Sequence, residues 1–188
     1  MRWPLLLVAA LLLAGCGNSG KLEPVDESRP AKPQRAELHW RESYPSSGQR
    51  LIFAVDSLEV TATGWSADIA VTNSTATSFD LGAVPAPSSF GLMLFANDSL
   101  EEFQKAAKSG RLPPPRTATR FDPALPDVLA PSQTWRGTIS APGSLAGGAY
   151  VRVSFGPLVA KGQPPDGMSS TVVWITDRSY RLKTEETL

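Results

Sequence analysis

Cysteine and histidine are nearly absent from this chain, which has one residue of each type among 188. Cys16 and His39 alone cannot assemble a zinc or copper site from the usual thiolate and imidazole ligands. A Ser-His-Asp triad also needs an activated serine, and the chain contains no Gly-x-Ser-x-Gly elbow to supply one. The sequence therefore predicts no catalytic residues, no metal site and no cofactor.

A net charge is missing as well, because 18 basic residues balance 18 acidic ones. A nucleic-acid-binding protein would need a dense basic surface, so nucleic acid is not an expected partner. Long apolar runs are also missing, since no stretch approaches the roughly 18 residues of a membrane-spanning helix. The chain is instead rich in turn formers, with 17 prolines and 15 glycines, and its 41% hydrophobic content is enough for a core.

The N-terminus has the pattern of a secretory signal. Met1 and Arg2 form a short basic start, and an apolar stretch from Trp3 to Leu13 follows. This stretch is too short to cross a bilayer as a helix, and it ends in small residues typical of a cleavage site. We therefore expect an exported protein.

The ending Leu13-Ala14-Gly15-Cys16 resembles the lipobox of bacterial lipoproteins. The resemblance implies that the Cys16 thiol carries acyl chains such as palmitate and that Cys16 is the first residue of the mature protein. It also implies a protein anchored by lipid in the cell membrane or outer membrane, facing the periplasm or the exterior. The alternative is an ordinary signal peptide cut near Ala14, which would leave Cys16 as a free thiol open to intermolecular pairing.

The rest of the chain divides into a tether, a folded domain and a tail. After a signal peptide over 1–15, we expect a tether over 16–36, because this segment is polar and contains three prolines. As a flexible coil its nineteen residues between 17 and 35 would span about 25 Å. A domain follows over 37–180 and a tail over 181–188, and the stretch from Asp177 could also be a final edge strand.

Short alternating segments predict an all-β domain. Leu51, Phe53 and Val55 alternate, and the phase then changes after Asp56-Ser57, as expected for a β-bulge or for a strand that changes sheet. The segment from Phe90 to Phe95 is apolar on both faces, which indicates a strand covered on both sides. Seven or so such strands at hairpin-like separations predict an antiparallel β-sandwich, with an open barrel as the alternative.

One helix is expected over about 99–109. Ser99 and Glu102 have the spacing of a capping box, in which each side chain bonds the other residue's amide. An apolar stripe of Leu100, Phe103 and Ala107 would pack on the sandwich, and Gly110 would end the helix. The polyproline stretch 113–115 follows.

Two stretches resemble bacterial immunoglobulin-like envelope domains. One is an alternating strand over 64–73 that ends in Thr72-Asn73 and is followed by Phe79-Asp80-Leu81. The other runs over 129–139 and continues in 147–153, like the last hairpin of such domains, although Ser132 stands in place of a usual glycine. The resemblance implies an immunoglobulin-like β-sandwich and carries no catalytic residues. The alternation itself predicts core positions for three tryptophans: Trp65, Trp135 and Trp174.

Two groups of residues are candidates for binding. Between residues 104 and 121 there is no acidic residue but there are five basic ones: Lys105, Lys108, Arg111, Arg116 and Arg120. They could form a docking surface for a wall polymer, phospholipid head groups or an acidic protein, or only a solvated connection beside an edge strand. Trp40 and Tyr44 could form an exposed aromatic pair, or belong to a first edge strand packed on one side.

These features favour a non-enzymatic, lipid-anchored binding or accessory module of the cell envelope. Its partners would be the membrane, through Cys16, and an envelope protein or an anionic wall polymer. A second hypothesis is a structural or stability subunit of an envelope complex, bound through its sheet edges. A third is a hydrolase that pairs two of the 18 carboxylates across space, although no spacing singles out a pair.

Overall fold

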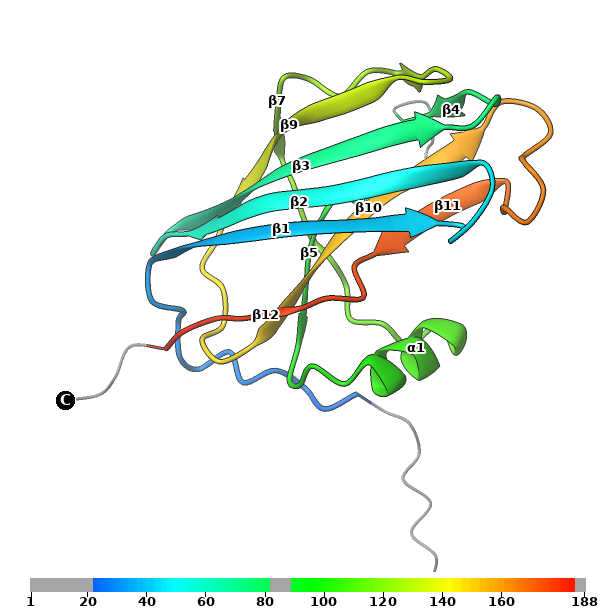
Figure 1. Cartoon of the computed structure of the whole chain (residues 1–188). Coiled ribbons are helices and arrows are strands. Elements are labelled where there is room, and N and C mark those ends of the chain that lie inside the picture. Colours follow the sequence, from blue (N-terminus) through cyan, green and yellow to red (C-terminus); the bar gives the residue numbers. More distant parts are fainter. Residues whose placement is uncertain (1–21, 82–88, 185–188) are drawn as a thin grey trace, which may run out of the picture.

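The computed structural model describes residues 22–81 and 89–184, which form two antiparallel β-sheets packed as a sandwich with one helix at one end (Figure 1). This confirms the all-β sandwich expected from the alternating pattern. Within these residues, no helix is long and apolar enough to cross a membrane. Cys16 lies outside the described residues.

The first sheet has the strand order β1-β2-β3-β9-β7. Its strands are β1 (Gln34–Tyr44), β2 (Arg50–Val60), β3 (Gly64–Ser74), β9 (Thr134–Pro142) and β7 (Arg120–Asp122). The second sheet has the order β6-β5-β10-β4-β8, and β11 and β12 also pair with β10. Its strands are β4 (Phe79–Asp80), β5 (Gly91–Phe95), β6 (Arg116–Thr117), β8 (Val128–Leu129), β10 (Tyr150–Ala160), β11 (Thr171–Ile175) and β12 (Tyr180–Arg181).

The phase change in β2 is a β-bulge, as the sequence predicted. Val55 lies opposite Ile69 of β3, and the next pair joins Ser57 to Asp68, so Asp56 has no partner in β3. The pairing of β2 with β1 is also irregular there, and exposed His39 of β1 has a positive φ of 49°. The irregularity lets β2 keep apolar side chains in the core on both sides of Asp56.

The main core lies between the sheets. Phe53 of β2 packs against Phe155 of β10 with ring centroids 5.1 Å apart, and it stacks on Trp174 at 5.6 Å. Trp65 and Trp135 are buried as expected. Trp174, also predicted to lie in the core, is only partly buried. Its ring packs on Phe53, and its indole nitrogen donates to the Glu42 carboxylate at 3.0 Å.

The helix α1 (Leu100–Lys108) covers the outer face of the second sheet, so both faces of β5 are buried, as the apolar run predicted. Phe103 of α1 packs edge-on against Phe95 of β5 at 5.7 Å. The predicted stripe is wrong in part. The buried positions are Phe103 and Ala106, which lie three residues apart on one face, whereas Leu100 is 42% exposed and Ala107 is exposed.

Half of the predicted capping box forms. The Ser99 hydroxyl accepts a hydrogen bond from the Glu102 amide at 3.2 Å. The Glu102 carboxylate, however, accepts from the side-chain amide of Asn97 at 2.9 Å, and the Ser99 amide donates to Asn97 Oδ1 at 3.0 Å. Asn97 therefore takes the place expected for Glu102 because it lies just ahead of the cap. The helix ends at Lys108, Ser109 is its C-cap, and Gly110 follows with a positive φ of 65°.

The N-terminal segment, residues 22–33, packs against the sandwich and corrects the expected tether over 16–36. Leu22 and Val25 contact the hydrophobic clusters, and Ala31 is only 5% exposed. The Ala31 amide donates to the Leu145 carbonyl at 2.7 Å, and the Lys32 amide donates to the Lys183 carbonyl at 2.9 Å. The apolar residues of this segment are isolated in sequence, so no periodicity revealed the contacts they make.

The C-terminal residues form a final strand, which is the alternative to a tail that the sequence allowed for the stretch from Asp177. Tyr180 and Arg181 pair with β10 as strand β12, and Leu182 is buried. Thr184 forms a bridge with Ala31. The tail expected over 181–188 is therefore part of the fold at its start, and residues 185–188 lie outside the described part of the chain.

Asn73 organises the end of β3. Its side-chain amide donates to the carbonyls of Thr77 at 2.8 Å and Leu129 at 3.1 Å. Its Oδ1 accepts from the Thr75 amide at 3.0 Å and the Thr75 hydroxyl at 2.8 Å. The nearby Ser132 has a positive φ of 62°, which explains why glycine suits its position.

Asn73→Ala should lower the free energy of unfolding by about 3 kcal/mol, because it leaves several buried polar groups without a hydrogen-bond partner. The matched control is Thr72→Ala on the same strand, whose hydroxyl makes one exposed hydrogen bond to Thr134, at 2.8 Å. Urea denaturation of both variants measures the difference. Equal losses of stability in the two variants would show that Asn73 does not organise this turn.

Candidate functional site

An apolar groove of about 650 Å³ opens beside the N-terminal segment. One wall is residues 22–27, the floor contains Leu94 and Phe95 of β5, and the other wall is residues 111–116 with its three prolines. Figure 1 shows the blue N-terminal segment and α1 at the same end of the sandwich. A volume of this size is typical of pockets for small or slender apolar ligands, roughly 300–1,000 Å³.

Charged side chains border the groove. Arg116 of β6 forms an ion pair with Glu27, so the pair joins the two walls. Both partners are about half exposed or more, so the pair contributes little to stability and can open. Arg111 is exposed, and its Nε donates to the Ser109 hydroxyl at 3.0 Å. The site thus combines an apolar interior with a charged border.

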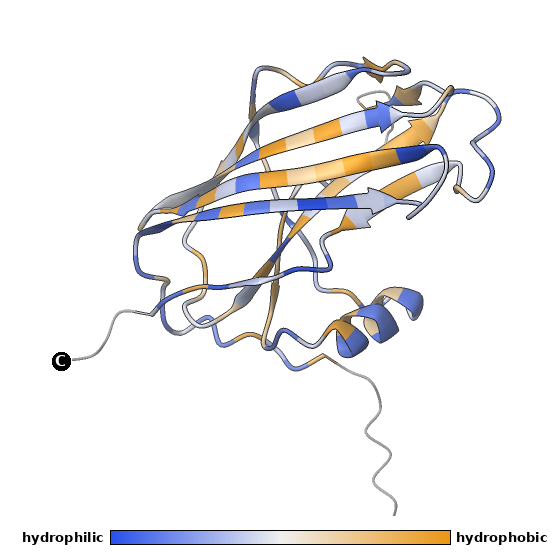
Figure 2. Ribbon diagram, viewed as in Figure 1, coloured by the Kyte–Doolittle hydropathy of each residue, from blue (hydrophilic) through white to orange (hydrophobic). Residues whose placement is uncertain are grey.

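The five predicted basic residues do not lie on one surface in the structure. Lys105 and Lys108 lie three residues apart on α1 and are exposed, and Arg111 follows the helix. We refer to these three residues as the basic face. Arg116 is held by Glu27, and Arg120 lies on β7 of the other sheet, where it is paired opposite Ser140. Figure 2 shows that polar residues predominate on α1.

Trp40 and Tyr44 do not form an exposed aromatic pair, and this hypothesis is wrong. Trp40 is 8% exposed and belongs to the main core. Tyr44 is partly buried, and its ring lies 5.8 Å from that of Trp174. The two aromatics therefore belong to a first edge strand packed on one side, because β1 pairs with β2 alone and turns its apolar residues to the core.

Arg152 of β10 is buried beneath α1, with 1% of its surface exposed. Its guanidinium lies 4.5 Å from the ring centroid of Phe103 and 5.6 Å from that of Phe95. It donates to the carbonyls of Thr176 at 2.9 Å, Asp177 and Asp98 at 3.2 Å, while its Nε has no partner. Burial lowers the pKa of Arg152, and nearby carboxylates, Asp177 first, oppose this shift.

Sequence reasoning missed Arg152 and the wall residues Leu22 and Val25. The alternation Val151, Val153, Phe155 places Arg152 on the outer face of the sheet, where an arginine is ordinarily solvated. The apolar outer face of β5 was the signal that could have indicated a buried Arg152. A strand that is covered on both faces implies that the outer face of its neighbour β10 is covered too. The aromatic pair Phe95 and Phe103 then provides the surfaces on which a guanidinium can stack.

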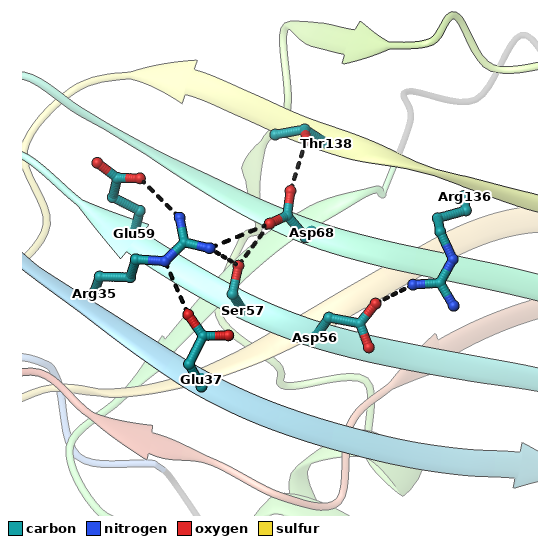
Figure 3. Close-up of polar contacts among 8 residues, drawn as sticks. All are labelled: Arg35, Glu37, Asp56, Ser57, Glu59, Asp68, Arg136 and Thr138. Atoms are coloured by element: carbon teal, nitrogen blue, oxygen red, sulfur yellow. Dashed lines mark hydrogen bonds and ion pairs between the residues drawn. The ribbon is translucent and has the colours of Figure 1, made fainter.

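A second polar cluster lies on the outer face of the first sheet (Figure 3). Arg35 contacts three carboxylates: Glu37 at 2.9 Å, Glu59 at 3.3 Å and Asp68 at 3.7 Å. Asp68 accepts from the hydroxyls of Thr138 at 2.6 Å and Ser57 at 2.7 Å. These two bonds, followed by the Arg35 charge, hold the pKa of the Asp68 carboxyl below its ordinary value. The side chains join β1, β2, β3 and β9, so the cluster is structural.

No protein-family model matches the chain, and no curated protein or solved structure is significantly similar to it.

The stabilising effect of Asp68 should depend on pH. Since the pKa of Asp68 is lowered in the folded state, its contribution is present above the unfolded value of about 3.9 and is lost as the pH falls through the folded value. Asp68→Asn should therefore be less stable than the original chain at pH 7, and the difference should shrink towards pH 3. Chemical denaturation across this range measures it, with exposed Asp166→Asn as the control. A difference that grows on acidification would contradict the assignment.

Arg152→Met should loosen α1. Methionine fills similar space but leaves the three carbonyls without their donor, at a cost of about 1–3 kcal/mol for each stranded buried group. Amide hydrogen exchange in α1 should accelerate about tenfold or more, and more than in the central strands β2 and β3. Arg136→Met is the control, because Arg136 is exposed and pairs only with Asp56. Unchanged exchange in α1 would show that Arg152 does not hold the helix.

Proposed function

We propose that this chain is a lipid-anchored, non-enzymatic binding or accessory module of the bacterial cell envelope, held to the membrane through Cys16. The observation that carries the proposal is the position of the groove. Its wall begins at Leu22, six residues after Cys16, and the basic face of Lys105, Lys108 and Arg111 borders the same end of the sandwich.

The short separation changes the expected relation between the domain and the membrane. Leu22 is the first residue that the structure describes, so residues 17–21 lie between it and Cys16, and a fully extended chain of this length reaches about 20 Å. The groove end is therefore the part of the domain nearest to the anchor. Positive charge within roughly 8–10 Å of an anionic surface is attracted to it, at about 1 kcal/mol for each Lys or Arg near the surface.

The basic face supports an anionic component of the envelope as the binding partner. In the described residues Lys105, Lys108 and Arg111 form no ion pair, whereas Arg116 is engaged by Glu27. Lys105 and Lys108 also lie in the last turn of α1, where their charges favour the negative end of the helix dipole. The side chains of Lys105 and Lys108 are therefore available to phosphate or carboxylate groups at the membrane or in the wall, and Arg111 makes a hydrogen bond to the Ser109 hydroxyl.

Reversing the three charges of the basic face should weaken this interaction by at least about a hundredfold. The combined variant Lys105→Glu, Lys108→Glu and Arg111→Glu, made in the chain with Cys16→Ala to remove the lipid, should bind anionic phosphatidylglycerol vesicles roughly a hundredfold more weakly. This magnitude follows from about 1 kcal/mol for each of three charges. Co-sedimentation with vesicles, and separately with purified anionic wall polymer, measures the binding.

The matched control reverses three charges elsewhere on the sandwich: Arg41, Arg50 and Arg120, each changed to Glu in the same Cys16→Ala chain. This control should keep most of the binding, and the binding of the unaltered basic face should weaken with added salt. Equal losses in both triple variants would overturn the proposed surface. If the chain with Cys16 intact is found without lipid in envelope fractions, the anchoring half of the proposal fails.

A further inference from the structure

The groove and the expected lipid are close together along the chain. Leu22 and Val25 form the wall of the groove, and Cys16 precedes Leu22 by six residues, a distance of about 20 Å at full extension. Any acyl chain on Cys16 is thus confined near the groove mouth. A group held this close along the chain has an effective concentration at the groove in the millimolar range.

We propose that the groove holds one acyl chain of the lipid attached to Cys16 of the same molecule. The inference rests on the proposed function, since it requires lipid at Cys16. The groove lining suits such an occupant. Leu22, Val25 and Pro113–Pro115 of the two walls supply most of the apolar surface, the largely buried Leu94 and Phe95 lie at the floor, and the charged residues lie at the border.

One acyl chain of the lipid can enter the groove while the protein stays anchored in the membrane. Stable anchoring needs two acyl chains, because a single chain binds a bilayer only marginally and reversibly. A lipoprotein anchor with three chains can therefore leave two in the bilayer and place the third in the groove. The bound chain would then hold the groove end of the sandwich, and with it the basic face, against the membrane surface.

The two walls of the groove are arranged to admit a chain from the membrane side. The N-terminal segment is continuous with the residues that lead to Cys16, and it is joined to the opposite wall by the exposed pair between Glu27 and Arg116. Three consecutive prolines stiffen the opposite wall, because the ring of each proline fixes its φ.

Photo-crosslinking of the lipidated full chain tests this inference. A diazirine-bearing amino acid replaces exposed Pro114 in the groove wall or, as a control, exposed Ser47 in the turn between β1 and β2. The protein is placed in vesicles of deuterated phosphatidylcholine and phosphatidylglycerol, so that bilayer lipid and the protein's own lipid differ in mass. A second variant carries the same group at Arg111, in case the change at Pro114 disturbs the wall.

Trypsin cleaves after Lys21, which releases the acylated peptide 16–21 for mass analysis. We expect this peptide to be joined to the peptide containing position 114 or 111, at a yield at least tenfold above that from position 47. Adducts with deuterated phospholipid, adducts with another protein, or no adduct at both wall positions would overturn the inference while leaving the anchor intact. An unmodified Cys16 in peptide 16–21 would overturn the anchor as well, so the two failures are distinguishable.

Discussion

The buried guanidinium of Arg152 is the interaction on which the α1 end of this molecule depends. It connects the start of α1, through the Asp98 carbonyl, to the end of β11, through the carbonyls of Thr176 and Asp177. Its flat cation also lies over the ring of Phe103. A buried charge is costly unless its donors are used, so the surrounding chain must keep these carbonyls in place. The helix that carries the basic face is thereby fixed to the sheet that forms the groove floor.

The sandwich supports this end by joining its two sheets at their edges. Glu42 of β1 accepts hydrogen bonds from the indole of Trp174 at 3.0 Å and from the amides of Asp177 at 2.9 Å and Arg178 at 3.2 Å. The same turn provides two of the carbonyls bound by Arg152. On the opposite edge the chain crosses between sheets, where the Ala118 amide bonds the Phe90 carbonyl at 2.8 Å. The turn after β11 therefore links the first sheet to α1, because Glu42 binds its amides and Arg152 joins its carbonyls to the Asp98 carbonyl ahead of the helix.

The fold was largely predictable because its signals are local in sequence. The bulge at Asp56 followed from a phase change, and the helix after Ser99 from its cap, since each depends on residues a few positions apart. The candidate site was not predictable in the same way. Leu22 and Val25 become a groove wall only through packing on residues far along the chain, and Arg152 is buried only because α1 covers it. The sequence could show five nearby positive charges but not how the fold divides them.

The N-terminal segment connects the expected anchor at Cys16 to the candidate site. It forms one wall of the groove, which Arg111 of the basic face also lines. The most direct measurement is the depth of this end relative to a bilayer. Lipidated protein carrying Arg111→Cys or Ser47→Cys, each labelled with a fluorophore, is placed in vesicles whose head groups bear spin-label quenchers. We predict strong quenching at position 111 and weak quenching at position 47. Equal quenching, or stronger quenching at position 47, would contradict a sandwich that faces the membrane with its groove end.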